Sequence, residues 1–173
     1  MSTLFETEID KGATFSPCRL YRYRLWRKWD PAKWPLIVIG LNPSTADDNI
    51  DDPTIRRCIG FARDWGYGGL VMLNAYAFRA TDPKVMQAHQ EPIGADNDQT
   101  MIDIATSGPN AEGPPLIIAA WGVHCSEERA ARICEVINRP IHCLGKTKAG
   151  APKHPLYLAK NTKPELFWSP ELC

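Results

Sequence analysis

The apolar positions of this chain follow two different periods, which predict strands in some segments and helices in others. Residues 20–27 alternate between apolar or aromatic side chains and arginines, a pattern typical of a half-buried strand. Residues 36–40, 70–75, 116–120 and 140–144 are short, almost wholly apolar runs, as in the central strands of parallel sheets. The chain therefore predicts one half-buried and four buried strands.

Helices are predicted between these strands. Asp52 and Pro53 match the N-cap and first position of a helix, and apolar side chains follow at helical spacing as far as Trp65. Further helices are expected after Asp82, over residues 95–105, and after Ser126, whose acidic neighbours suit the positive end of a helix dipole.

Buried strands that alternate with helices join through right-handed crossovers into a parallel sheet. We therefore predict a three-layer α/β/α fold with a central four-stranded parallel sheet and an N-terminal antiparallel strand or hairpin. Residues 1–173 are expected to form a single domain, in which residues 1–16 are loosely ordered.

Composition indicates an ordinary globular protein. With 173 residues, the chain is long enough to bury roughly 70% of its unfolded surface without a disulfide or metal. The longest apolar runs fall far short of the roughly 20 residues that a membrane span needs. No signal peptide is recognisable and the six cysteines form no CxxC pair, so we expect a cytoplasmic protein without a disulfide framework. The evenly spaced Cys125, Cys134 and Cys143 are expected to be buried thiols and not metal ligands.

The net charge is zero, but the charges are segregated. Residues 19–28 and 146–163 are basic and contain no acids, whereas residues 47–52 and 82–103 carry the balancing aspartates and glutamates. The two basic segments could form one stripe that faces phosphates, or they could be solvated faces of the fold.

Candidate chemistry follows the predicted strands, because parallel sheets bind ligands at the carboxyl ends of their strands. The residues at or after the ends of these strands are Gly40, Leu41, Asn42, Pro43 and Ser44 at the first, Asn74, Tyr76 and Phe78 at the second, Trp121 at the third, and Lys146, Lys148, Lys153 and His154 at the fourth. GxSxG, Walker and GxGxxG motifs are absent. Amide and imidazole groups at one sheet edge suit recognition of a flat polar heterocycle, since a side-chain amide offers a donor and an acceptor together.

The acidic run that follows this turn allows two interpretations. Asp52 matches a helix N-cap and Asp51 lies near the same dipole end. Asp47, Asp48 and Asp51 are alternatively candidate oxygen ligands for a divalent ion. We expect that these aspartates cap the helix and hold its loop, and that the protein has no metal and no cofactor.

Several motifs carry a family resemblance. Through GLNPSTAD, DDPTIRRC, LNAYAFRATDP, the WG after the third strand and KHPLYL, residues 19–168 resemble an uncharacterised bacterial and phage family. More distantly, the layout resembles the uracil-DNA glycosylase superfamily, whose Gly-x-Asn-Pro and His-Pro motifs are matched at residues 40–43 and 154–155. Asn74 matches its base-reading asparagine.

The resemblance to the glycosylases implies specific roles. Asn42 would position a water molecule, Asn74 would hydrogen-bond the base, and His154 would stabilise charge on the departing base. Leu156 or Leu158 would fill the gap left by a flipped base. Stacking would fall to Tyr76, Phe78 or Trp121, because residues 44–46 replace the usual aromatic, and phosphates would be held by Lys146, Lys148 and Lys153.

The sequence thus predicts a glycosylase-like enzyme that hydrolyses an N-glycosidic bond in DNA or in a nucleotide. Its expected partner is a nucleic acid or nucleotide and not a membrane. Two alternatives stay open: a non-catalytic module that binds a nucleobase or nucleic acid, and a metal-assisted hydrolase that uses the aspartates.

Overall fold

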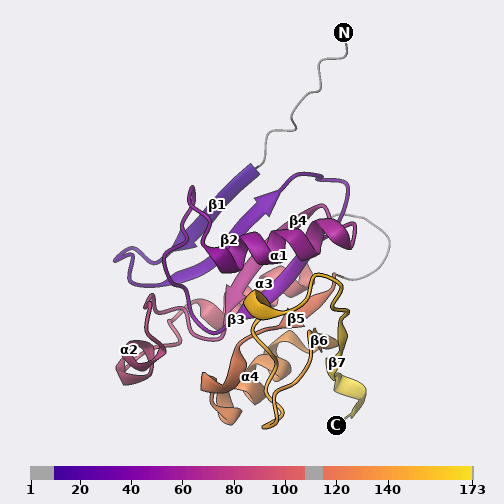
Figure 1. Cartoon of the computed structure of the whole chain (residues 1–173). Coiled ribbons are helices and arrows are strands. Elements are labelled where there is room, and N and C mark those ends of the chain that lie inside the picture. The colour runs from indigo at the N-terminus through magenta and orange to yellow at the C-terminus, as the bar shows by residue number, and fades with distance from the viewer. Residues whose placement is uncertain (1–9, 108–114, 173) are drawn as a thin grey trace.

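The computed structural model describes residues 10–107 and 115–172, which form one mixed sheet with helices on both faces (Figure 1). In chain order the elements are β1 (Asp10–Phe15), β2 (Arg22–Lys28), β3 (Pro35–Gly40), α1 (Pro53–Asp64), β4 (Gly69–Asn74), α2 (Pro83–Ala88), α3 (Asn97–Thr106), β5 (Ile117–Ala119), η1 (Gly122–His124), α4 (Glu127–Ile137), β6 (Ile141–Cys143), η2 (Pro155–Tyr157), β7 (Glu165–Trp168) and η3 (Pro170–Leu172).

The sheet differs from the predicted one. It has seven strands in the order β1-β2-β4-β3-β5-β6-β7. The pairs β3–β4, β3–β5 and β5–β6 are parallel, whereas β1–β2, β2–β4 and β6–β7 are antiparallel. The prediction of a central four-stranded parallel sheet with an N-terminal antiparallel strand or hairpin was therefore wrong, since the structure has one seven-stranded mixed sheet with antiparallel pairs at both edges.

Both edges contain strands that the apolar pattern did not indicate. Residues 10–15 form β1, although residues 1–16 were expected to be loosely ordered; residues 1–9 lie outside the described part of the chain. β7 forms in the C-terminal tail and is half exposed. Edge strands bury only part of their surface, so their sequences carry a weaker apolar signal.

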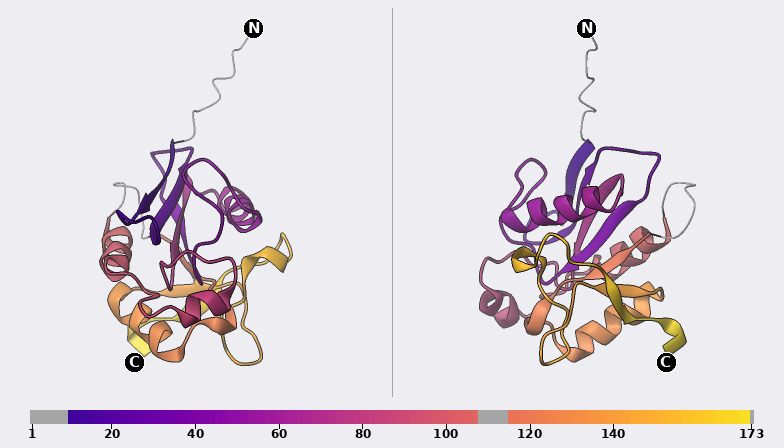
Figure 2. Two further views of the ribbon diagram at one scale, coloured as in Figure 1. Left: turned by 90° about the vertical axis from the view of Figure 1, so that its left-hand side faces the viewer. Right: turned by 45° about the vertical axis from the view of Figure 1, so that its right-hand side comes forward.

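The helices form the two outer layers (Figure 2). On one face, α1 packs Ile55 and Phe61 against side chains of β3 and β4, among them Leu36 and Met72. On the other face, α3 and α4 pack against the opposite side chains of the same strands, with Met101 and Ile133 in that core. None of the helices in the described residues is long and apolar enough to cross a membrane.

Helix starts agree with the predicted caps. The Asp52 carboxylate accepts a hydrogen bond from the Ile55 backbone N–H at 2.8 Å, and the Ser126 hydroxyl accepts from Arg129 N–H at 3.1 Å. Asp82 likewise caps α2 through the Lys84 N–H. The N-terminal ends of α1, α2 and α4 are thus set by capping residues that can be recognised in the sequence.

Candidate functional site

A cavity of about 540 Å³ opens on the α1 face of the sheet, at the carboxyl ends of β3 and β4. Its size falls within the range of about 300–1,000 Å³ that is common for small-molecule sites. Eight of the predicted site residues line it: Gly40, Leu41, Asn42, Ser44, Asn74, Trp121, Lys153 and His154. The cavity therefore brings together the turn after β3, the end of β4 and the loop before η2.

The other predicted site residues lie outside this cavity. They are Pro43, Tyr76, Phe78, Lys146, Lys148 and Leu156. Tyr76 is buried against α4, where its hydroxyl donates to Ser126 Oγ at 3.3 Å, and Phe78 stacks on His89 with ring centroids 3.9 Å apart. Of the three aromatic residues considered for stacking on a base, Trp121 is thus the one that lines the cavity.

The floor of the cavity contains a buried amide without a partner. Asn74 is only 1% exposed, and its Nδ2 makes no hydrogen bond with any described residue. Gly40 lies beside it on β3, where a Cβ atom would lie 3.2 Å from Asn74 Oδ1 and 2.7 Å from Met72 Cε. An unpaired buried donor costs about 1–3 kcal/mol of folding free energy. A ligand that accepts a hydrogen bond from Asn74 Nδ2 would remove this cost.

Asn42 is held in one orientation by the main chain. Its Nδ2 donates to the Ala80 carbonyl at 2.8 Å and to the Pro43 carbonyl at 3.2 Å. Asn42 therefore ties the loop after β4 to the turn after β3. These bonds use the donor end of the amide, so Oδ1, a hydrogen-bond acceptor, is the end left for a ligand or a water molecule.

His154 is arranged as a neutral donor at the rim of the cavity. Its Nδ1 accepts a hydrogen bond from the Leu156 backbone N–H at 3.3 Å, which places the ring proton on Nε2. Burial lowers the pKa of His154, while the nearby Asp52 charge opposes this shift. Arg57 of α1 donates to the Leu158 carbonyl and so holds the segment that follows His154.

Arg22 lines the cavity, although sequence reasoning did not single it out. Its side chain is buried, Nη1 donates to the Ala46 carbonyl at 2.5 Å, and Nε has no partner among the described residues. Burial lowers the pKa of Arg22 to about 10, and the Asp52 charge counteracts the shift. A buried guanidinium with spare donors makes this part of the cavity positive.

A β-bulge explains why the alternation of β2 did not reveal Arg22. Thr14 pairs with Arg24 but the next residue, Phe15, pairs with Arg22, so Tyr23 is an extra residue in β2. The bulge places Arg22 and Arg24 on opposite faces of the sheet, whereas strict alternation predicts one face for both. Bulges that redirect a side chain are common beside functional sites.

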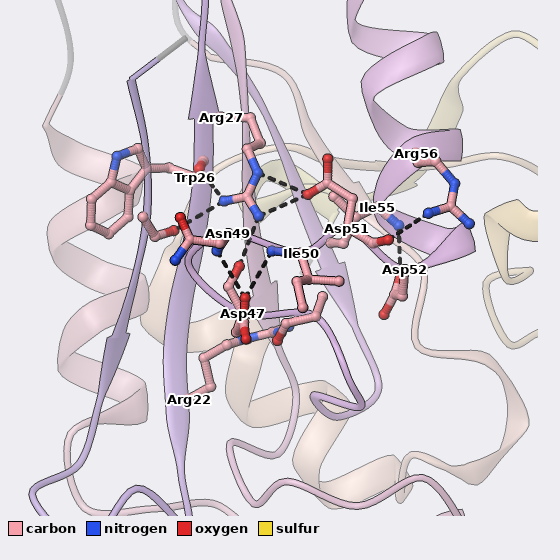
Figure 3. Close-up of polar contacts among 12 residues, drawn as sticks. Arg22, Trp26, Arg27, Asp47, Asn49, Ile50, Asp51, Asp52, Ile55 and Arg56 are labelled. Atoms are coloured by element: carbon pink, nitrogen blue, oxygen red, sulfur yellow. Dashed lines mark hydrogen bonds and ion pairs between the residues drawn. The ribbon is translucent and has the colours of Figure 1, made fainter.

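The acidic run is organised mainly by Arg27 (Figure 3). Arg27 Nε and Nη2 both lie 2.8 Å from Asp51 Oδ1, and Nη2 also donates to the Asp47 carbonyl. The Asp47 carboxylate accepts from the N–H groups of Asn49 and Ile50, which hold its pKa below the usual value. Most of the run therefore builds the loop that leads into α1.

The predicted metal candidates do not meet in a cluster. Asp47, Asp48 and Asp51 lie outside the cavity. Within residues 10–107 and 115–172, no group of three histidine, cysteine, aspartate or glutamate side chains is placed to hold a metal ion.

The cavity adds a further set of residues that sequence reasoning had not assigned to the site. Besides Arg22 they include Asp52, Thr54, Ile55, Met72, Val123, Thr147 and Tyr157. Asp52 was interpreted only as a helix cap. Asp52 is ten residues beyond Asn42 in the sequence, so no local pattern places it at the end of β3. The folded loop between them brings both residues into one cavity.

Comparison with known proteins identifies the family. Residues 22–156 match the family described as "Protein of unknown function (DUF1643)", and the chain belongs to this family. No curated protein and no solved structure matches the chain significantly.

Proposed function

We propose that this member of the DUF1643 family binds a nucleobase in its cavity and hydrolyses the N-glycosidic bond of the nucleotide that carries it. The observation that carries the proposal is the buried, unpaired amide of Asn74 at the carboxyl end of β4. A base with a carbonyl or ring-nitrogen acceptor would satisfy this donor. A ligand without such an acceptor would leave it unpaired, at a cost of about 1–3 kcal/mol.

The remaining groups support hydrolysis. Breaking an N-glycosidic bond leaves negative charge on the departing base, and the neutral His154 offers Nε2–H as a donor to it. The fixed Oδ1 of Asn42 can orient a water molecule. Both lie in the segments that resemble the motifs of the uracil-DNA glycosylase superfamily, and Trp121 provides an aromatic wall.

A non-catalytic binding module is the second candidate. It is favoured by Asn42, because three main-chain carbonyls, those of Pro43, Phe78 and Ala80, already accept from its amide. Such a residue has a structural role whether or not water is activated. A metal-assisted hydrolase gains less support, since Asp51 is engaged by Arg27 and Asp47 by its own turn.

A base-release assay tests the proposal. The protein is incubated with nucleotides and with single- and double-stranded DNA that contain uracil, hypoxanthine, xanthine or 5-modified pyrimidines, with and without a chelator. Release of one base is expected, and His154→Asn should lower its rate by about 10²–10³-fold because Asn keeps a capping acceptor but lacks the Nε2 donor.

Lys163→Ala is the control, because Lys163 is exposed, lies outside the cavity and is not among the lysines expected to hold phosphates. It should keep nearly full activity on a nucleotide. Binding of a base-containing ligand without release of any base would instead support the binding module. Neither binding nor release across the whole panel would refute the nucleobase proposal.

A further inference from the structure

Asp52 is the single carboxylate among the described residues that line the cavity. Its Oδ1 accepts the capping hydrogen bond from Ile55 N–H, and its second oxygen has no hydrogen-bond or ion-pair partner among the described residues. The Asp52 side chain is half-buried and lines the cavity. The carboxylate thus combines a fixed position with a free acceptor.

The fixed position comes from three directions. The cap anchors Asp52 to α1, and Arg56 holds the preceding residue through the Asp51 carbonyl at 2.5 Å. The Arg27–Asp51 ion pair holds the same loop against β2 (Figure 3). A group held this rigidly loses little freedom when a substrate binds, as a catalytic group requires.

The electrostatic surroundings also suit a base. Asp52 interacts with two groups of the cavity, the buried guanidinium of Arg22 and the imidazole of His154, without forming an ion pair with either. Because no cation covers the second oxygen, that oxygen remains available to a water molecule.

We infer that Asp52 is the general base of this site, an inference that rests on the proposed N-glycosidic hydrolysis. The Asn42 amide can orient a water molecule but has no site that takes up a proton at neutral pH. In the step that we assign to Asp52, the water oxygen forms a bond to the anomeric carbon and a water proton passes to the carboxylate. The C–N bond breaks, and its electron pair leaves with the base, which His154 Nε2–H stabilises. The proton held by Asp52 then leaves to solvent, and the base takes up one proton, so that base and sugar hydroxyl are the products.

Asp52→Asn tests this inference without removing the helix cap. Asn is as good an N-cap as Asp, so the urea midpoint of unfolding should stay close to that of the parent protein. The turnover number for base release should fall by about 10²–10⁴-fold, the usual contribution of a general base. The dissociation constant of the substrate, measured by calorimetry, should change by less than about threefold. Asp48→Asn removes one negative charge from the same loop outside the cavity and should leave turnover unchanged.

The outcomes separate this inference from the proposed function. Full turnover by Asp52→Asn would overturn the inference and leave the hydrolase proposal intact. An equal loss of turnover in Asp52→Asn and Asp48→Asn would also overturn it, because general loop charge would then explain both. If the parent protein binds the base but releases none, the proposed hydrolysis and the role of Asp52 both fail.

Discussion

Replacing Arg27 of β2 by alanine should destabilise the protein, because this side chain holds the loop that precedes α1. The Arg27 side chain is only 3% exposed, and it bonds the Asp51 carboxylate and the carbonyls of Asp47 and Trp26, each at 2.8 Å. These bonds join β2 to the loop between β3 and α1 (Figure 3). Truncation leaves all three acceptors without their cation.

The expected cost follows from the burial of Arg27, whose side chain is 3% exposed, whereas that of Asp51 is 29% exposed. Removing one member of a fully buried ion pair costs about 3–5 kcal/mol, and hydration of the remaining Asp51 carboxylate places this case at the lower end, about 3 kcal/mol. The total stability of a domain is about 5–15 kcal/mol, so the loss is a large part of it. For a domain of this size, each kcal/mol shifts Tm by about 2–4 °C, which predicts a fall of roughly 6–12 °C.

Urea unfolding and thermal melts measure this loss. Arg27→Lys keeps the charge but not the planar fork that reaches three acceptors, so its stability should lie between those of the parent and Arg27→Ala. A double-mutant cycle with Asp51→Ala should give a coupling energy above about 1 kcal/mol. An Arg27→Ala variant that loses less than about 1 kcal/mol would refute the argument that this pair holds the loop.

Three further outcomes are expected. Asn74→Leu removes a buried donor that has no partner, so the ligand-free protein should be as stable as the parent or up to about 2 kcal/mol more stable, while calorimetry should show base binding reduced at least tenfold. Burial lowers the pKa of His154 and His142, so the unfolded chain binds these protons at higher pH than the folded chain; stability should therefore fall as pH drops below about 6.5, and a double His→Gln variant should show a smaller fall in urea midpoint between pH 8 and pH 5. Burial raises the pKa of Cys58 to about 12, whereas a hydrogen bond with Ser16 lowers the pKa of the exposed Cys18. Thiolates are the reactive form, so Cys18→Ser should abolish a fast phase of thiol labelling and Cys58→Ser should not.

The centre of the fold could be predicted from sequence because its signals are local. The strands β3 and β4 are continuous apolar runs, and the caps at Asp52 and Ser126 are read from single residues. The topology could not be predicted in the same way. Whether β2 forms a separate hairpin or joins β4 depends on pairing between distant segments, as in Leu25 opposite Met72, and no local pattern specifies that choice.

The site could be predicted in part for the same reason. Asn42 follows the apolar strand β3 and Asn74 ends the apolar strand β4, so their place at the sheet edge can be read from the sequence. Arg22 reaches the cavity because of the bulge at Tyr23, which interrupts the alternation of side chains along β2. Residues at functional sites often depart from regular patterns in this way, because their positions serve a ligand and not the regular geometry of the strand.

The acidic run after the first strand shows how stability and chemistry are divided among neighbouring residues. Asp47 accepts hydrogen bonds within a turn and Asp51 pairs with Arg27, and both residues lie outside the cavity. Asp52 accepts the helix-capping hydrogen bond with one carboxylate oxygen, and its other oxygen has no partner among the described residues. The same cavity is lined by Arg22 and Asn74, whose Nε and Nδ2 donors are buried and unpaired. One free carboxylate in the same cavity as several donors is what the proposed hydrolysis would need, a single base and a stabilised leaving group. A two-carboxylate reaction would require a second acid, and the described cavity lining does not contain one.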